Sequence, residues 1–174
     1  MTLQAPIRCS YVVPGHALAA GEYPFSYDRE KGVAKLAAVL DAGIDCFLDL
    51  TTAYDPLEPY QEELLALGKA RSIPVRYVRM AITDMDVPSA AHMSRILDCI
   101  DDALGRGERP YVHCWGGAGR TGTVIGCFLV RRGMTGEEAL AEVARLAAHY
   151  CESPQTWEQC EFVRNWTEPP RAAP

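Results

Sequence analysis

Two kinds of hydrophobic pattern alternate along the chain. Short apolar runs at 44–50, 75–82 and 109–114 are typical of buried strands, and the apolar residues around Pro14 and Gly15 predict two short strands joined by a turn. Longer segments repeat apolar residues every three or four positions, which predicts helices at 27–43, 59–70, 90–104, 121–132, 136–150 and 156–166. Strands separated by helices favour an α/β fold, with a central mixed, mostly parallel sheet flanked by helices on both faces.

The chain has 174 residues, of which 48% are hydrophobic, so it is long enough for one domain with a full core. We expect residues 1–166 to form that domain and the proline-rich end, 167–174, to be a flexible tail. No apolar run reaches the roughly 18 residues that span a bilayer, and the N-terminus lacks the order of a secretory signal. These features predict a soluble, cytoplasmic protein.

Charge and cysteine usage exclude several classes of function. The net charge is −6 at pH 7, which argues against binding to nucleic acid, because phosphate backbones are held by clustered Lys and Arg. The seven cysteines include no CxxC pair and no His/Cys group with zinc-ligand spacing. We therefore expect reduced thiols and no metal or other cofactor. Cys114 is the cysteine that does not fit a purely apolar setting.

Cys114 opens the stretch CWGGAGR, between the last predicted strand and an almost wholly apolar helix. At such a turn, backbone amides and the helix N-terminus can bind an anion. The residues expected to line an anion are Trp115, Gly116, Gly117, Ala118 and Gly119. The glycines let the chain curl around one oxyanion, and Arg120 adds a guanidinium suited to two phosphate oxygens. The same positive field favours the thiolate of Cys114, which we expect to attack a bound phosphate.

The stretch HCWGGAGRTG resembles the HCxxGxxR[ST] signature of the cysteine-dependent protein tyrosine and dual-specificity phosphatases. The resemblance is strongest over about 80–166 and weaker in the N-terminal half. It implies the fold of that family and a phosphoryl group transferred to Cys114 while Arg120 and the loop amides hold it. It also implies that His113 supports the loop and that Thr121 donates a hydrogen bond to the sulfur.

The same resemblance points to a general acid, which must protonate the oxygen of the leaving group. In the small dual-specificity enzymes this acid lies on a loop about 30 residues before the cysteine. The loop at 83–88 offers Asp84 and Asp86, and we favour Asp84, because the spacing to Pro88 matches the family pattern. The alternative is that either carboxylate only caps a helix or is solvated.

A glutamine is expected to position the water that hydrolyses the phosphorylated cysteine. The segment QTWEQCEF resembles the corresponding segment of tyrosine phosphatases, and this likeness assigns the role to Gln155, with Gln159 as a second candidate. Ordinary capping of the last helix explains the same residues equally well. Trp115 and Tyr54 are candidates for the rim of the pocket.

These features predict a phosphomonoester hydrolase, most simply a protein tyrosine or dual-specificity phosphatase. The loop contains no lysine, and together with the acidic net charge this disfavours a highly anionic membrane substrate. A small soluble phosphoester, such as an inositol phosphate, stays open. A phosphate-binding module without turnover is the alternative from another class, and a rhodanese-like sulfurtransferase fits the motif poorly. The sequence leaves the oligomeric state and the physiological substrate open.

Overall fold

The computed structural model describes residues 3–169. The predicted flexible tail, 167–174, falls mostly outside these residues. The strands within the described part are β1 (Ser10–Val12), β2 (Ala19–Gly21), β3 (Cys46–Asp49), β4 (Arg76–Arg79) and β5 (Pro110–His113). The helices there are α1 (Arg29–Asp41), α2 (Gln61–Ala70), α3 (Ala90–Gly105), α4 (Gly119–Arg131), α5 (Gly136–Ala147) and α6 (Trp157–Arg164).

The strands form one sheet with the order β1-β2-β5-β3-β4, in which β1 and β2 are antiparallel and the other pairs are parallel. The predicted fold class is therefore confirmed. The central strand β5 pairs Val112 with Ala20 on one side and with Leu48 on the other. Because β5, β3 and β4 run in the same direction, the segments that follow them leave from one edge of the sheet.

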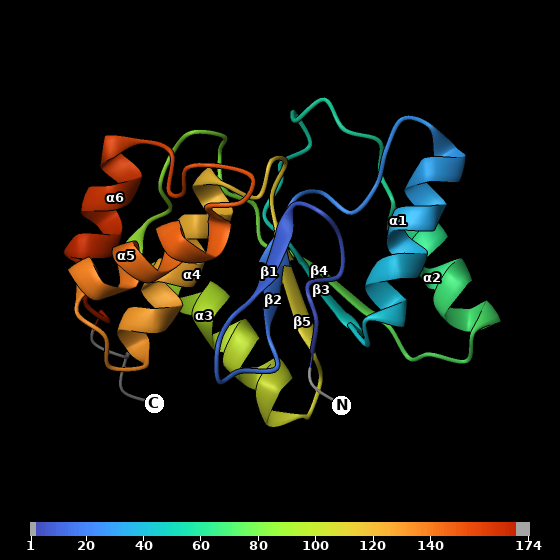
Figure 1. Ribbon diagram of the computed structural model, residues 1–174, viewed down its shortest axis with the longest axis horizontal. Coiled ribbons are helices and arrows are strands. Elements are labelled where there is room, and N and C mark those ends of the chain that lie inside the picture. Colours follow the sequence, from blue (N-terminus) through green and yellow to red (C-terminus); the bar gives the residue numbers. More distant parts are fainter. Residues whose placement is uncertain (1–2, 170–174) are drawn as a thin grey trace.

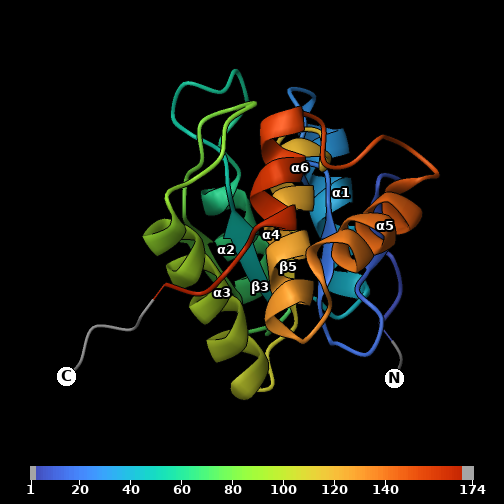
Figure 2. The ribbon, with the colours of Figure 1, turned by 90° about the vertical axis from the view of Figure 1, so that its left-hand side faces the viewer.

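Helices cover both faces of this sheet (Figure 1). Helices α1 and α2 lie on one face, where Leu36, Phe47 and Leu64 share a core cluster. Helices α3 to α6 lie on the other face, and the view in Figure 2 shows them together. Their cluster includes Met93, Ile125 and many of the other apolar residues of these helices. Because helices cover both faces, the central strands β3 and β5 are buried along their whole length.

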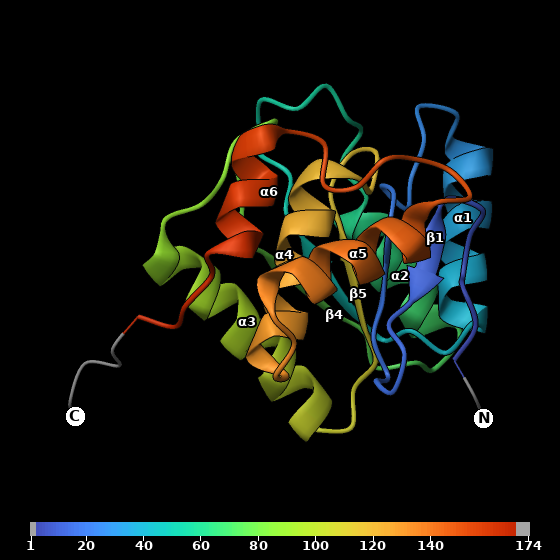
Figure 3. The same cartoon turned by 60° about the vertical axis from the view of Figure 1, so that its left-hand side comes forward.

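Helix α4 is the innermost helix, because α5 and α6 pack over it (Figure 3). Its residues from Gly119 to Leu129 are all buried, which accounts for the nearly continuous apolar sequence. Two glycines allow the close packing. A Cβ on Gly126 would lie 2.7 Å from Val163 of α6, and one on Gly122 would lie 2.0 Å from the Oγ atom of Ser153. Larger residues at either position would push the covering segments away.

Helix α3 begins at the predicted residue and ends one residue later than the predicted 90–104. Ser89 accepts a hydrogen bond from the amide of His92, as an N-cap of α3. Gly105 is the last residue of the helix, and the C-cap is Arg106. None of the helices described here is long and apolar enough to cross a membrane.

Strand β4 ends at Arg79, three residues before the end of the apolar run that predicted it. The extended backbone nevertheless continues beside β3. The amide of Met80 donates to the carbonyl of Asp49, and the amide of Ile82 donates to the carbonyl of Leu50, both at 2.9 Å. These bonds bring the segment after β4 next to the segment after β3. Both then lie at the edge of the sheet where β5 ends.

Candidate active site

The candidate site lies at the carboxyl edge of the sheet, where residues 114–118, here called the Cys114 loop, join β5 to α4. Cys114 directly follows β5 and is 3% exposed. The side chain before it, His113, is wholly buried. The expected position of the thiol, at the junction of a strand and a helix, is therefore found.

The carbonyl oxygens at the start of the Cys114 loop are bonded to groups outside it. The amide of Tyr23, in the segment after β2, donates to the carbonyl of Trp115 at 2.8 Å. The Nδ1 atom of His113 lies 3.3 Å from the carbonyl of Cys114. Because a carbonyl can only accept, this contact requires a proton on Nδ1.

The carbonyl oxygens at the end of the loop are held in the same way. The hydroxyl of Tyr150 donates to the carbonyl of Gly117 at 3.2 Å, and the hydroxyl of Ser153 donates to the carbonyl of Ala118 at 2.7 Å. Both donors come from the segment between α5 and α6. In the described part of the chain, none of the amides of residues 115–118 donates to another protein atom. Such a group of unengaged amides is suited to bind an oxyanion.

Gly117 is required by the shape of the loop. Its φ of +74° lies in the left-handed region, and a Cβ there would lie 2.3 Å from the backbone of Gly21 in β2. Gly116 has no such constraint, because nothing lies within 4 Å of a Cβ at that position. Of the two glycines in the Cys114 loop, only Gly117 packs directly against strand β2.

His113 connects the Cys114 loop to the buried side chain of Tyr60. Its Nε2 atom lies 2.6 Å from the hydroxyl of Tyr60, which is also buried. Burial lowers the pKa of His113, so the ring is neutral at physiological pH. A neutral ring with its proton on Nδ1 accepts the hydroxyl proton of Tyr60 at Nε2 and donates toward the carbonyl of Cys114. These contacts suit a supporting residue.

Arg120 is the positive group of the site. It lies in the first turn of α4 and is 1% exposed. Its two terminal nitrogens donate to the two carboxylate oxygens of Asp55 at 3.0 and 2.9 Å, and Nη1 also donates to the carbonyl of Ile82. Burial disfavours the charged guanidinium, but the bonds to Asp55 and the charge of Cys114 outweigh it and raise the pKa of Arg120.

Asp55 is a residue of the site that the sequence analysis did not identify. Its side chain is 3% exposed, and its Oδ2 atom also accepts from the amide and hydroxyl of Thr52 at 2.6 and 2.8 Å. Partial burial opposes ionisation, yet the bonds from Arg120 and Thr52 hold the pKa of Asp55 below its ordinary value. Asp55 is therefore an ionised anchor for the guanidinium. The only signal for Asp55 in the sequence is its position in a polar loop, directly after Tyr54.

Two buried donors of the site have no partner among the described residues: the Nε atom of Arg120 and the hydroxyl of Thr121. An unpaired buried donor costs about 1–3 kcal/mol of stability, so such donors are rare in folded proteins. Where two of them lie in one site, a bound ligand is a natural partner for them. The Nε atom of Arg120 is therefore available to a ligand. No hydrogen bond joins the hydroxyl of Thr121 to the sulfur of Cys114 in this part of the chain, so the role expected for Thr121 stays a prediction.

The two candidate acids face different ways. Asp84 lies 2.9 Å from the Nη2 atom of Arg120, and its side chain is 50% exposed. Asp86 accepts from the amide of the next residue, Val87, at 2.7 Å. Met85, between them, has a φ of +62° and so reverses the direction of the backbone. The structure thus brings Asp84 to the site and turns the carboxylate of Asp86 onto its own loop.

The two candidate glutamines both lie over the start of α4. A Cβ on Gly119 would lie 2.8 Å from the Oε1 atom of Gln155 and 2.9 Å from that of Gln159. Gln159 is wholly buried and fully engaged: it accepts from the amides of Gln155 and Thr156 and donates to the carbonyl of Asp86. Gln155 is exposed, and its side-chain amide makes no hydrogen bond to another described residue. Of the two glutamines, Gln155 is the one whose side chain is available to a water molecule.

The mouth of the site is a cavity of about 230 Å³. Its lining residues are Thr52, Tyr54, Asp55, Pro56, Thr83, Asp84 and Trp115. The aromatic rings are open to solvent, since Tyr54 is 96% and Trp115 46% exposed. Trp115 and Tyr54, the residues expected at the rim, both line this cavity together with Asp84, and their part in binding a substrate stays a prediction.

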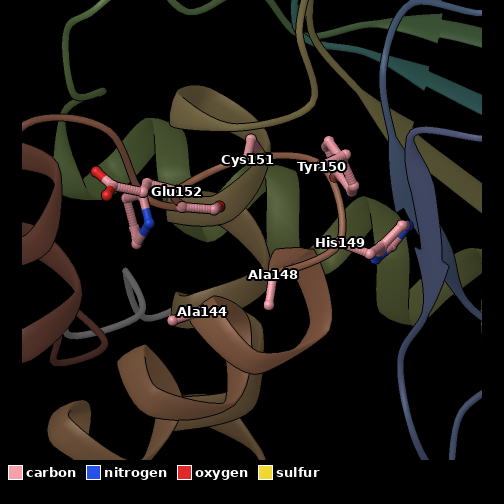
Figure 4. A pocket seen from close by; sticks show the side chains of 8 residues that line it. Ala144, Ala148, His149, Tyr150, Cys151 and Glu152 are labelled. Atoms are coloured by element: carbon pink, nitrogen blue, oxygen red, sulfur yellow. The ribbon is translucent and has the colours of Figure 1, made fainter.

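A larger hollow of about 770 Å³ lies along the end of α5 and the segment that follows (Figure 4). His149 points toward the first strands in this view, and its Nε2 atom lies 3.2 Å from the carbonyl of Arg8. Burial, together with the charge of Cys114, raises the pKa of Cys151 to about 11. Neither residue lines the cavity at Asp84 and Trp115, so this hollow is separate from the mouth of the site.

Comparisons with known proteins agree with this geometry. The chain matches a family model described as "PTP-SAK: Swiss Army Knife protein, DSP-PTPase phosphatase domain" over residues 6–168. It is 38% identical over 95 residues to an uncharacterized protein of Methanocaldococcus jannaschii, a match that covers 54% of this chain and 60% of that relative.

Two solved structures share the fold. The crystal structure of Tk-PTP in the active form has a TM-score of 0.72 and 27% identity, covering 89% of this chain and 93% of that one. The core catalytic domain of the PP-IP phosphatase SIW14 from S. cerevisiae has a TM-score of 0.66 and 16% identity, covering 90% and 85%. Together with the family model, these findings confirm the resemblance seen in the sequence: the chain belongs to the cysteine-dependent dual-specificity phosphatase family and carries its phosphatase domain.

Proposed function

We propose that the chain hydrolyses phosphomonoesters through a phosphorylated Cys114, with phosphotyrosyl and other phosphorylated proteins as substrates. One observation supports this most directly. Cys114 begins a loop in which four of the five carbonyls accept hydrogen bonds from groups outside it and the amides of residues 115–118 are unengaged, beside the buried guanidinium of Arg120. This is a site for a phosphoryl group next to a sulfur nucleophile.

In the first step, the thiolate of Cys114 attacks phosphorus, the S–P bond forms, and the bond to the substrate oxygen breaks. The loop amides and Arg120 stabilise the charge on the three other phosphoryl oxygens. The departing oxygen takes a proton from Asp84, the half-exposed carboxyl group beside Arg120. Asp86 is the less suitable acid, because its carboxylate is bonded to its own loop.

In the second step, water attacks the phosphorus of the phosphocysteine, releasing inorganic phosphate and restoring the thiolate. Asp84, left ionised by the first step, accepts a proton from that water. Gln155 positions the water, because its amide group lies over the start of α4 without another partner. Gln159 instead ties the last helix to the loop of Asp86.

A protein substrate is favoured by the surroundings of the site. The mouth is lined by Tyr54, Trp115 and two carboxylates, and the Cys114 loop contains no lysine. An aromatic rim suits the ring of a phosphotyrosine, whereas carboxylates repel a substrate with many phosphates. Small phosphoesters remain the second candidate, because one structural neighbour is a PP-IP phosphatase and another is a complex of PTPMT1 with PI(5)P. A cytoplasmic location stays a prediction.

Cys114→Ser is expected to lower the turnover of p-nitrophenyl phosphate by at least about a thousandfold, because the nucleophile is lost. Vanadate binding should remain measurable, since the amides and Arg120 are unchanged. Steady-state kinetics and a vanadate titration measure the two properties. Cys160→Ser, on α6 and outside the loop, serves as the matched control. Turnover retained in Cys114→Ser would contradict the assignment of the nucleophile.

Asp84→Asn is expected to lower kcat by about 10²–10⁴-fold, because the leaving oxygen loses its proton donor. Steady-state kinetics on a phosphotyrosyl peptide measure the loss. Asp86→Asn is the control in the same loop and should behave like the wild type; the reverse result would move the role to Asp86.

Asp55→Asn is expected to raise KM and the inhibition constant of inorganic phosphate by about tenfold, with a smaller change in kcat. An amide offers one acceptor in place of two charged ones, so the guanidinium of Arg120 is held less firmly. Asp41→Asn, which breaks an exposed pair with Arg71, is the matched control. Unchanged phosphate inhibition, with only a lower melting temperature, would show that Asp55 is merely structural.

Turnover is expected to be unaffected by excess EDTA, because the proposed mechanism uses no metal ion. The measurement compares initial rates on p-nitrophenyl phosphate before and after chelation and dialysis. Activity that disappears with EDTA and returns with a divalent cation would overturn the metal-free mechanism.

A further inference from the structure

A second cavity, of about 190 Å³, adjoins the mouth of the candidate site and shares Trp115 with it. Its lining residues, here called the side subsite, are Glu22, Tyr23, Phe25, Ser26, Tyr27, Lys35, Leu57, Glu58 and Trp115. No step of the proposed mechanism uses this cavity.

The walls of the side subsite are joined by hydrogen bonds, so the cavity is preformed. The hydroxyl of Tyr23 donates to the carbonyl of Glu58 at 3.0 Å, and the hydroxyl of Tyr27 donates to the carbonyl of Pro56. These bonds connect the segment that leads into α1 with the segment that leads into α2, which lie beside each other in Figure 1. The amide of Tyr23 also bonds to the carbonyl of Trp115, which fixes the subsite to the Cys114 loop.

The subsite combines aromatic rings with an excess of negative charge. Tyr27 is 68% and Trp115 46% exposed, so both ring systems are available to a ligand. Lys35, a cation of the lining, is already engaged: its Nζ atom lies 2.9 Å from the carboxylate of Glu22 and 3.1 Å from the carbonyl of Tyr23. The carboxylate of Glu58 makes no ion pair or hydrogen bond with another described residue. Such surroundings favour a cation.

We propose that the side subsite binds a lysine or arginine side chain of a phosphorylated protein substrate, next to the phosphorylated residue at Cys114. The inference rests on the proposed function. The side subsite can select among protein substrates only when the phosphorylated residue of the same substrate is bound at Cys114, on the other side of Trp115. The aliphatic part of such a side chain packs on the rings, and its charge faces Glu58. A free anion or a membrane headgroup would instead meet unpaired negative charge.

The test uses phosphotyrosyl peptides that differ only in the residue directly before or after the phosphotyrosine: lysine, norleucine or glutamate. For the wild type, kcat/KM is expected to be about fivefold higher with lysine than with norleucine, and lower again with glutamate. The preference should weaken as salt is added. Because preference is a ratio measured within one protein, differences in folded fraction cancel.

Glu58→Gln should reduce the lysine preference to near one, and Glu58→Lys should reverse it in favour of glutamate. Glu62→Gln, an exposed carboxylate on α2 outside the subsite, is the matched control and should keep the wild-type preference. A wild type that treats the lysine and glutamate peptides alike, or a Glu58→Gln variant with its preference intact, would overturn the proposal. Better turnover of an inositol phosphate than of every peptide would contradict the protein-phosphatase function instead, and the binding measurement below separates that outcome from a failure of the side subsite.

The same peptides are titrated against Cys114→Ser by calorimetry, which does not depend on turnover. A lysine preference in binding supports the side subsite even if the wild type hydrolyses none of the peptides, an outcome that would contradict the proposed function alone. Equal affinity for all three peptides would contradict the side subsite alone.

Discussion

The outward bonding of the carbonyl oxygens in the Cys114 loop is the constraint on which the site depends. If those carbonyls turned inward, their dipoles would oppose both a thiolate and a bound oxyanion. Tyr23, Tyr150 and Ser153 prevent this by donating to three of the carbonyls. These donors come from the segment after β2 and from the segment after α5. Elements that are distant in the sequence therefore set the electrostatics of a loop whose own sequence is mostly glycine and alanine.

The charge of Arg120 is shared between two carboxylates that differ in burial. The side chain of Asp55 is 3% exposed and bonds to both terminal nitrogens, whereas the side chain of Asp84 is 50% exposed and contacts one. Separating the buried pair costs more, because it leaves uncompensated charges in a poorly solvated place. We expect an incoming phosphoryl group to displace Asp84 and not Asp55. Substrate binding then frees the proposed acid at the moment when the leaving oxygen arrives.

The parts of the site that are contiguous in the sequence could be predicted, and the parts that depend on tertiary pairing could not. Cys114 and Arg120 lie in one motif between a strand and a helix, so their spacing alone placed them together. Asp55 reaches Arg120 across 65 positions, through the pairing of β3 with β5. The preference for Asp84 over Asp86 came from the spacing to Pro88, whereas the positive φ at Met85, between the two carboxylates, is not revealed by any hydrophobic pattern. The helices, in contrast, followed from periodicity and caps.

Because the chain is acidic, binding of the phosphoryl group and discrimination among the neighbouring substrate residues depend on different kinds of electrostatic interaction. With a net charge of −6, long-range attraction for a phosphate is absent, so the phosphoryl group is held by short-range dipoles of the loop and by Arg120, which Asp55 already partly neutralises. Buried dipoles and pairs are screened little by salt. The side subsite, with Glu58 exposed, acts through charge at the surface and is screened strongly. Ionic strength should therefore change the discrimination among neighbouring residues far more than the binding of the phosphoryl group itself.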